Sequence, residues 1–429
     1  MRRKSRFMKL ASMLSVSVLL VGLIISCGSN SSDNGSQPVT YSDPTEAANG
    51  ASSAKASVDM TSAMSEAAAG LSSSSSNPAG YAPGKGGITA TDTSSIANID
   101  PKLKTLVDGM LASMKAPVVQ NAVSKARASK AKVSMATGPG NPGVVTISGL
   151  CSGGTGTFTI TGTDSSNVGT YVEYTVDIRF DSCRDVPDTA GIYSITTGTI
   201  HVYDKEMAGN TAITRNATLD LTADKFNSSY MLVKTDVVKA TFDATDSGSA
   251  TSRSGRNTAN GSFSEKDWSM NETGTFYFTN MTSDWTWDDV SDVITVANTA
   301  NGNFGLNFVN ASQTLTLNIG LSNLQNKLRF NANASIDQWV NGSVTITWTP
   351  DLSIFGCRSG RITFTTADAT PLHYFDNLDT CPDSGTLQVN NATIVYYGPD
   401  DPTHIVVSVG ALSVPLIDCT YMEGGICGN

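Results

Sequence analysis

The 429-residue chain has few charged residues and very few histidines. Asp, Glu, Lys and Arg make up 15% of it, and the three histidines are His201, His373 and His404. The catalytic patterns G-x-S-x-G, H-E-x-x-H and G-x-x-x-x-G-K-[ST] are absent, and so is Cys-x-x-Cys. The sequence therefore gives no support to a serine hydrolase, a zinc protease, a P-loop NTPase or a c-type haem protein, and no cofactor is expected.

Long apolar runs are also lacking, apart from one at the start of the chain. Five basic residues within residues 2–9 precede an uncharged stretch, residues 10–25, which ends at Ser26 and Cys27. A charged head, an apolar centre and a small residue before the cleavage point are the parts of a secretory signal peptide. The run is too short for a comfortable permanent membrane span. Residues 1–26 are therefore predicted to be a leader.

The end of this leader, Ile24-Ile25-Ser26-Cys27, resembles a bacterial lipobox. The resemblance implies that Cys27 becomes a lipidated N-terminus, where two or three acyl chains such as palmitate would hold the protein on a membrane stably. No Asp follows Cys27 directly, and in similar Gram-negative lipoproteins this goes with export to the outer membrane, on its periplasmic or its cell-surface face. An ordinary signal peptide with a chance cysteine is the alternative. The rest of the chain resembles no functional family.

The charge of the chain bears on its partners. The full chain carries −10, and removal of residues 1–26 takes away five positive charges and no negative ones, which leaves −15. An acidic protein repels nucleic acid and anionic lipid headgroups. We therefore expect no nucleic-acid partner, and we expect membrane contact through the lipid on Cys27.

Composition divides the mature chain into three parts. Residues 27–92 are rich in Ser, Ala, Gly, Asn and Thr and are predicted to be a flexible tether. Residues 93–137 are predicted to be helical: Asp100 is a good N-cap, Pro101 suits the first helical position, and an apolar face follows. A Gly- and Pro-rich stretch, residues 138–143, then marks the start of a domain at residues 144–429.

In this last part the sequence alternates between apolar and polar residues. Residues 157–161, 171–178, 274–278, 314–319 and 344–348 all show the period of two that is typical of strands with one buried face. Asn260-Gly261, Asn301-Gly302 and Asn341-Gly342 are predicted to be hairpin turns between such strands. The expected fold is mainly β, either one large antiparallel sheet or a β-sandwich, preceded by the tether and short helices. A membrane-spanning β-barrel is the structural alternative.

Six further cysteines and an internal duplication complete the expected architecture. Segments at about 144–203 and 343–397 share Cys, Gly, Thr, Phe and Asp residues at offsets that fall from 206 to 194. Six cysteines allow fifteen connectivities, and pairing in sequence order is the simplest. The duplication favours this order because each copy then contains its own pair. The predicted disulfides join Cys151 with Cys183, Cys357 with Cys381, and Cys419 with Cys427.

Two places carry candidate ligand-binding residues. Trp285 and Trp287 are flanked by Asp284 and Asp288, and two indoles beside carboxylates are suited to stacking on sugars and bonding their hydroxyls. The alternative is that both indole rings lie in the hydrophobic core, because Trp is normally buried. A weaker candidate is a calcium site formed by the loop between Cys357 and Cys381 and the residues just after it. Its ligands would be Asp376, Asp379 and Asp383, with an ordinary acidic loop as the alternative.

These features predict an envelope lipoprotein, anchored through Cys27 to the outer membrane, whose β-rich part binds or scaffolds without catalysis. Its expected partners are an envelope polysaccharide or another envelope protein. The alternatives are an exported carbohydrate-active hydrolase that uses an Asp/Glu pair, and an outer-membrane β-barrel.

Overall fold

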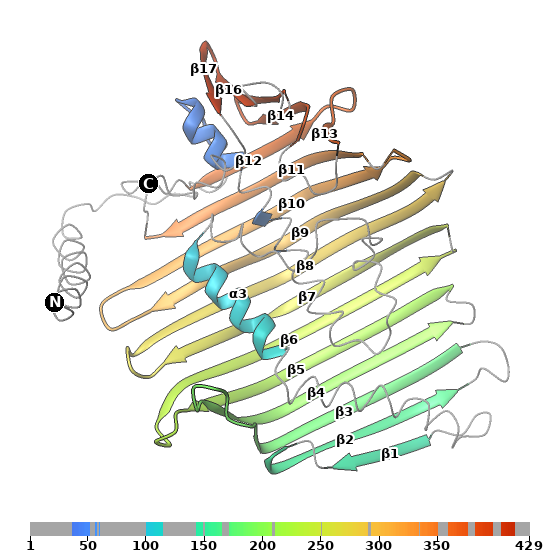
Figure 1. The fold of residues 1–429 in the computed structure, drawn as a ribbon, viewed down its shortest axis with the longest axis vertical. Helices are drawn as coiled ribbons and strands as arrows, with labels where there is room; N and C mark the ends of the chain where they lie inside the picture. Colours follow the sequence, from blue (N-terminus) through green and yellow to red (C-terminus); the bar gives the residue numbers. More distant parts are fainter. Residues whose placement is uncertain are drawn as a thin grey trace. The chain divides into compact units, whose positions relative to one another are not determined.

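Seventeen strands form one antiparallel sheet in the described part of the chain (Figure 1). The prediction of a mainly β protein with one large antiparallel sheet is therefore confirmed. The structure is a computed structural model. It describes residues 37–51, 56–57, 60, 100–114, 143–148, 151–164, 171–207, 211–249, 251–290, 293–333, 335–350, 359–375, 382–397 and 405–416.

Most strands pair with the next strand along the chain, from β1 to β11 and from β14 to β17. Both β12 and β13 pair with β11, and β12 also pairs with β14. The strands are β1 (Gly143–Ser148), β2 (Gly153–Asp164), β3 (Tyr171–Arg184), β4 (Tyr193–Met207), β5 (Ala212–Phe226), β6 (Leu232–Gly248), β7 (Ser252–Asp267), β8 (Glu272–Val290), β9 (Val293–Val309), β10 (Thr314–Phe330), β11 (Ile336–Thr349), β12 (Gly360–Thr366), β13 (Leu372–Tyr374), β14 (Gly385–Val389), β15 (Ala392–Tyr396), β16 (Ile405–Val409) and β17 (Leu412–Leu416).

The two faces of the sheet differ in polarity because the side chains alternate along each strand. On one face, Phe263 of β7, Phe276 of β8 and Leu306 of β9 are aligned by the register and fully buried. The opposite face carries mainly Thr, Ser, Asn and Asp. An antiparallel sheet tolerates this division because only one of its faces has to be covered. We call these two sides the buried face and the polar face.

Helix α3 (Pro101–Met114) lies across β6 to β9 on the buried face (Figure 1). The carboxylate of Asp100 accepts hydrogen bonds from the backbone N–H groups of Lys102 (2.7 Å) and Leu103 (3.0 Å), as the predicted N-cap requires. Leu103 and Val107 are fully buried against the sheet. No helix of the described residues is both long and apolar enough to cross a bilayer.

Part of the predicted tether contacts the sheet, which corrects that prediction over residues 37–51. The backbone N–H of Val39 donates to the carbonyl of Arg361 (2.9 Å). Residues 44–51 are helical, and Ala47 and Ala48 are buried. Alanine loses no side-chain rotamer freedom on burial, so a segment of low hydrophobicity can still pack where its alanines share one face. The rest of residues 27–92 lies outside the described residues, except for 56, 57 and 60.

The prediction that three Asn-Gly pairs form hairpin turns is wrong. Asn260-Gly261, Asn301-Gly302 and Asn341-Gly342 lie in the middle of β7, β9 and β11. These strands are 14 to 17 residues long, well above the common length of about 5–6. A type I′ hairpin needs positive φ at both central residues, and here only the glycines have it.

The Asn-Gly pairs instead adjoin β-bulges in the neighbouring strands. The register of β8 against β9 shifts between Thr279 and Thr282, next to Gly302. Gly302 has a φ of 121°, and a Cβ there would overlap the carbonyl oxygen of Asn280. The side-chain oxygen of Asn301 accepts a hydrogen bond from the backbone N–H of Asn323 on β10 (2.7 Å). Since bulges bend and twist a strand, these positions form a line along which the sheet can curve.

The two segments that align as an internal duplication differ in where their strands turn. Thr196, Thr199 and Ile200 all lie within the single strand β4. The residues aligned with them at an offset of 194 are Asn390, Thr393 and Ile394. Thr393 and Ile394 lie in β15, but Asn390, whose φ is 50°, lies in the turn between β14 and β15. Over this stretch, one strand of the first segment is therefore aligned with a hairpin of the second.

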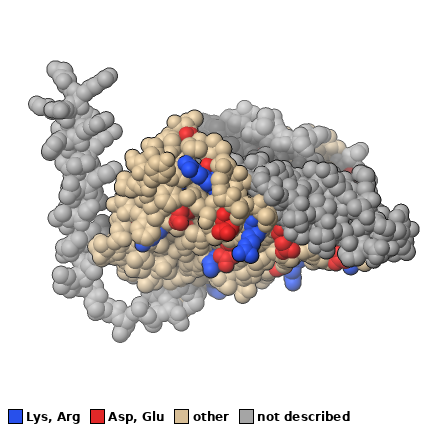
Figure 2. All heavy atoms as spheres, turned by 90° about the horizontal axis from the view of Figure 1, so that it is seen from below, with Lys and Arg blue, Asp and Glu red and all other residues tan. Residues whose placement is uncertain are grey.

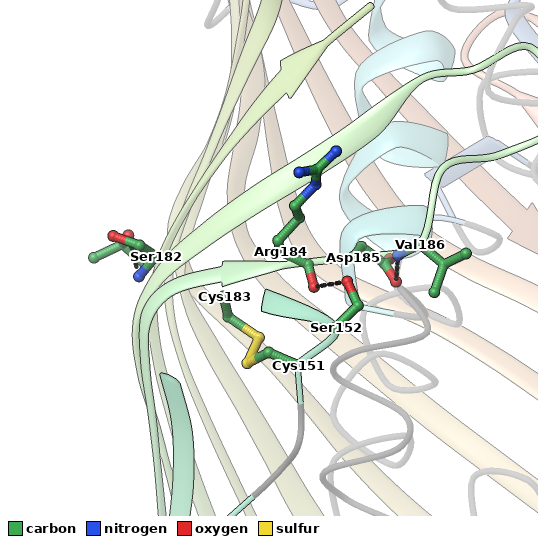
Figure 3. The surroundings of a disulfide bond; sticks show 8 residues. Cys151, Ser152, Ser182, Cys183, Arg184, Asp185 and Val186 are labelled. Carbon is green, nitrogen blue, oxygen red and sulfur yellow. Dashed lines mark hydrogen bonds between the residues drawn. A yellow bond between two sulfur atoms is a disulfide. The ribbon is translucent and has the colours of Figure 1, made fainter. Parts of the chain in front are cut away.

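The predicted disulfide between Cys151 and Cys183 is confirmed (Figure 3). It joins the residues just before β2 to the end of β3, with the two Cα atoms 5.2 Å apart. Beside it, the hydroxyl of Ser152 donates to the carbonyl of Arg184 (2.7 Å). The bond therefore fixes the first long hairpin at its open end. The other predicted disulfides, between Cys357, Cys381, Cys419 and Cys427, lie outside the described residues.

Candidate binding site

A trough of about 630 Å³ crosses the polar face from β5 to β10. Its floor is a row of short side chains that the strand register aligns across five neighbouring strands. The row consists of Ala212, Ser247, Ser254, Thr286 and Ala297. Longer side chains would fill this space, so the small residues are what makes the surface concave.

A second row of larger polar side chains lies beside the floor. The register places these residues opposite one another on consecutive strands, two positions along from the floor residues. They are Thr214, Thr245, Arg256, Asp284, Thr299 and Gln325. Hydroxyl, guanidinium, carboxylate and amide groups together supply both donors and acceptors. The trough is therefore a hydrogen-bonding surface with a shallow, small-residue floor.

Arg256 and Asp284 form the charged centre of this second row. The guanidinium donates two hydrogen bonds to the two carboxylate oxygens, at 2.6 Å and 2.8 Å. The hydrogen bonds from Arg256 hold the pKa of Asp284 below its usual value, so this carboxylate is charged at neutral pH. Both side chains remain accessible, with 61% of Arg256 and 43% of Asp284 exposed. The pair presents a fixed donor and a fixed acceptor to solvent.

The two tryptophans predicted to stack on sugars lie on the opposite side of the sheet from Asp284. Trp285 is 7% exposed on the buried face, where its ring lies over Gly255 of β7, and a Cβ at Gly255 would overlap that ring. Trp287 is half-buried and follows two residues later on the same face. Only the backbone of Trp285 reaches the trough. The structure thus separates the indoles from the carboxylates.

The other predicted residues contribute less to the trough. Asp288 lies on the polar face with Asp284, but beyond the trough, where it accepts a hydrogen bond from the hydroxyl of Ser252. Asp383 is buried and accepts a hydrogen bond from the backbone N–H of Phe375. No group of three or more His, Cys, Asp or Glu in the described residues is placed to hold a metal ion. Asp376, Asp379 and Cys27 lie outside the described residues.

Arg256 is the main residue of the trough that the sequence did not indicate. It lies in the segment Ser252–Asp267, which is polar on both faces and shows little alternation. Its pairing with Asp284 depends on the register of the β7–β8 hairpin. A shift of one residue would turn Arg256 to the buried face. One sequence feature could have indicated Arg256. It lies in a strand that a short turn joins to the strand containing Asp284, Asp288 and Asp289.

Charges of opposite sign lie close together on the part of the surface visible in Figure 2. On the polar face, Lys239 and Asp220 form a second cross-strand pair at 3.6 Å, outside the trough. The charged residues that line the trough are Arg256, Asp284 and Asp246, and each is paired with a residue of opposite charge. The trough is therefore suited to a ligand recognised through hydrogen bonds more than through net charge.

Glycoside hydrolysis by a carboxylate pair needs two facing carboxyl groups, one of which acts as a general acid. Of the two carboxylates that line the trough, Asp284 is paired with Arg256. Asp246, the other carboxylate among the lining residues, is buried and paired with Arg253. Comparisons of the chain with protein-family models, with curated proteins and with solved structures found no match.

Proposed function

We propose that this protein is a membrane-anchored lipoprotein of the cell envelope whose trough binds a polysaccharide without catalysis. The observation that carries the proposal is the small-residue floor beside the Arg256–Asp284 pair on the polar face. The lipobox-like Ile24-Ile25-Ser26-Cys27 supports the proposed anchor and the proposed location at the outer membrane.

A polysaccharide suits this trough in both chemistry and shape. Sugar hydroxyls donate and accept hydrogen bonds, and the rows of Thr, Ser, Gln, Arg and Asp offer both kinds of partner. The floor extends across five strands, or roughly 19 Å at a strand spacing of about 4.8 Å. A trough this long and shallow fits an extended chain of sugars better than a compact small molecule. Its volume lies within the usual range for ligand sites.

Binding is tested with purified protein, peptidoglycan sacculi and soluble polysaccharide released from lipopolysaccharide. The double variant Arg256→Gln, Asp284→Asn keeps the side-chain size and removes both charges. We expect it to lower the affinity for the bound polysaccharide about tenfold or more, because hydrogen bonds to charged groups contribute about 1.5–3 kcal/mol each. Calorimetry or co-sedimentation gives the affinities.

The matched control is Lys239→Gln, Asp220→Asn, which removes the exposed cross-strand pair on the same face outside the trough. It should leave the affinity within about twofold, since exposed pairs contribute little to stability or fold. Equal losses in the two double variants, or no binding of either polysaccharide by the wild type, would reject the trough as the site. New reducing ends in the polysaccharide would instead favour a hydrolase.

A further inference from the structure

Four alternate hairpins, every second one along the chain, turn at the same side of the sheet and carry exposed apolar side chains. The turns between β3 and β4, β5 and β6, β7 and β8, and β9 and β10 share this side because the strands are antiparallel and sequential (Figure 1). We call the exposed apolar residues there the turn rim. They are Val186 (69% exposed), Ile192 (38%), Tyr230 (72%), Met231 (61%), Trp268 (46%), Met270 (66%) and Val309 (40%).

The opposite side of the sheet differs in composition. Ser249 and Thr251 occupy the turn between β6 and β7, and Asn331 and Ser335 flank the turn between β10 and β11. Among the described residues at this side, two large apolar side chains are exposed, Val290 (65%) and Phe375 (69%), which lies beside Ser335 in the register of β11 with β13. More of the exposed large apolar side chains therefore lie at the turn rim than at the opposite side of the sheet.

The turns of the rim have internally satisfied backbones. The side-chain oxygen of Asn227 accepts from the N–H of Ser229 (2.9 Å), and the N–H of Tyr230 donates to the carbonyl of Asn227 (2.9 Å). In the next turn the carboxylate of Asp267 accepts from the N–H groups of Ser269 (2.9 Å) and Met270 (3.1 Å). Turns that bind their own N–H groups can enter a less polar medium at lower cost.

Trp268 is held in a fixed orientation at the centre of the rim. Its indole N–H donates to the hydroxyl of Thr235 (2.9 Å), and the amine of Lys266 lies 3.6 Å from the centre of its ring. An indole with one polar end, beside a long cationic side chain, is the combination enriched at membrane–water interfaces. Tyr230, with its polar hydroxyl, has the same amphipathic character.

We propose that the turn rim lies in the headgroup region of the membrane that carries the lipid anchor, so that the sheet stands on its hairpin ends. The proposal rests on the anchoring part of the proposed function. A bilayer is favoured over a protein partner because the apolar side chains sit singly or in pairs on separate turns, about two strand spacings or roughly 10 Å apart. A protein interface needs a contiguous buried centre, whereas a fluid interface accepts separate insertions. The charged Asp267 beneath its turn limits the depth to the headgroup level.

The depth of Trp268 is measured by tryptophan fluorescence quenching. The lipidated mature protein is reconstituted into phosphatidylcholine vesicles with bromine near the top of the acyl chains. Trp285, Trp339 and Trp348 are buried, and the half-buried Trp287 lies near the end of β8 at the opposite side of the sheet. Trp268→Phe therefore removes the exposed reporter at the rim. We expect quenching in the wild type and its loss in Trp268→Phe. Val290→Ser, at the opposite side, should quench like the wild type, and melting curves confirm that the variants are folded.

Flotation of the vesicles separates this inference from the proposed function. Protein that fails to float with the vesicles lacks the anchor and contradicts the proposed function. In that case a chain of residues 27–429, bound by an N-terminal histidine tag to nickel-chelating lipids in the same vesicles, gives the same comparison. With either means of attachment, equal quenching in the wild type and Trp268→Phe would contradict the proposed membrane contact of the turn rim. Quenching in the wild type and Val290→Ser, but not in Trp268→Phe, would support it.

Discussion

Replacement of Phe263 by alanine should lower the free energy of unfolding by about 3–5 kcal/mol, the usual cost of deleting a buried phenylalanine ring. Phe263 is fully buried on β7, where it lies opposite Val238 and Phe276 on the neighbouring strands. Its ring also faces Gly109 of α3, where an added Cβ would lie 3.0 Å from the ring. The substitution thus opens a cavity between the sheet and the helix that covers it. Guanidinium-induced unfolding followed by circular dichroism measures the change.

Phe375→Ala is the control for this prediction, because Phe375 is 69% exposed. It should change the free energy of unfolding by no more than about 0.5 kcal/mol. If Phe263→Ala cost as little as Phe375→Ala, α3 would not cover this part of the sheet.

Replacement of Gly302 by alanine should destabilise the protein by at least about 2 kcal/mol, although it adds one methyl group. The φ of Gly302, 121°, is one that residues with a side chain rarely adopt. The new Cβ would also overlap the carbonyl oxygen of Asn280, which belongs to the backbone of β8 and cannot rotate away. Either β8 or β9 must shift, and the bulge between them is lost. Thermal unfolding at equal protein concentration reports the effect.

Gly153→Ala is the control, because it tests whether replacing any strand glycine by alanine destabilises the protein to the same extent. A Cβ at Gly153 would lie 3.5 Å from the Cβ of Arg184, an ordinary contact, and its φ is not positive. We expect a change within about 1 kcal/mol of the wild type. Comparable losses at Gly153 and Gly302 would show that the mid-strand bulge has no special role.

Alternation of apolar and polar residues was sufficient to predict most of the sheet. The segment Thr314–Ile319, for example, alternates without interruption and lies in β10, with its leucines towards the core. The helix at Pro101–Met114 could also be predicted from the sequence, because the N-cap Asp100 is followed directly by an apolar helical face. Both features depend on neighbouring residues, and local sequence determines them directly.

The course of the long strands could not be predicted in the same way. An Asn-Gly pair has the same local preference in a hairpin turn and beside a mid-strand bulge. What decides at Asn301-Gly302 is the neighbouring strands, which supply Asn280 and Asn323 in left-handed conformations. The alanines at 47 and 48 are a similar case, because burial of such small side chains depends on the surface they meet.

The trough was only partly predictable for the same reason. Asp284 was a candidate because it adjoins two tryptophans, yet its partner is Arg256, 28 residues earlier in the chain. The small residues of the floor come from five strands, and only the register brings them into one row. A surface made of one residue per strand leaves no pattern in a single stretch of sequence.

Mass spectrometry of the N-terminal peptide, from protein purified from the cell envelope, tests the central proposal most directly. We predict that this peptide begins at Cys27 and that its sulfur carries a diacylglyceryl group, with residues 1–26 absent. A free thiol at position 27 with the leader still attached would contradict the account of this protein as an anchored envelope lipoprotein.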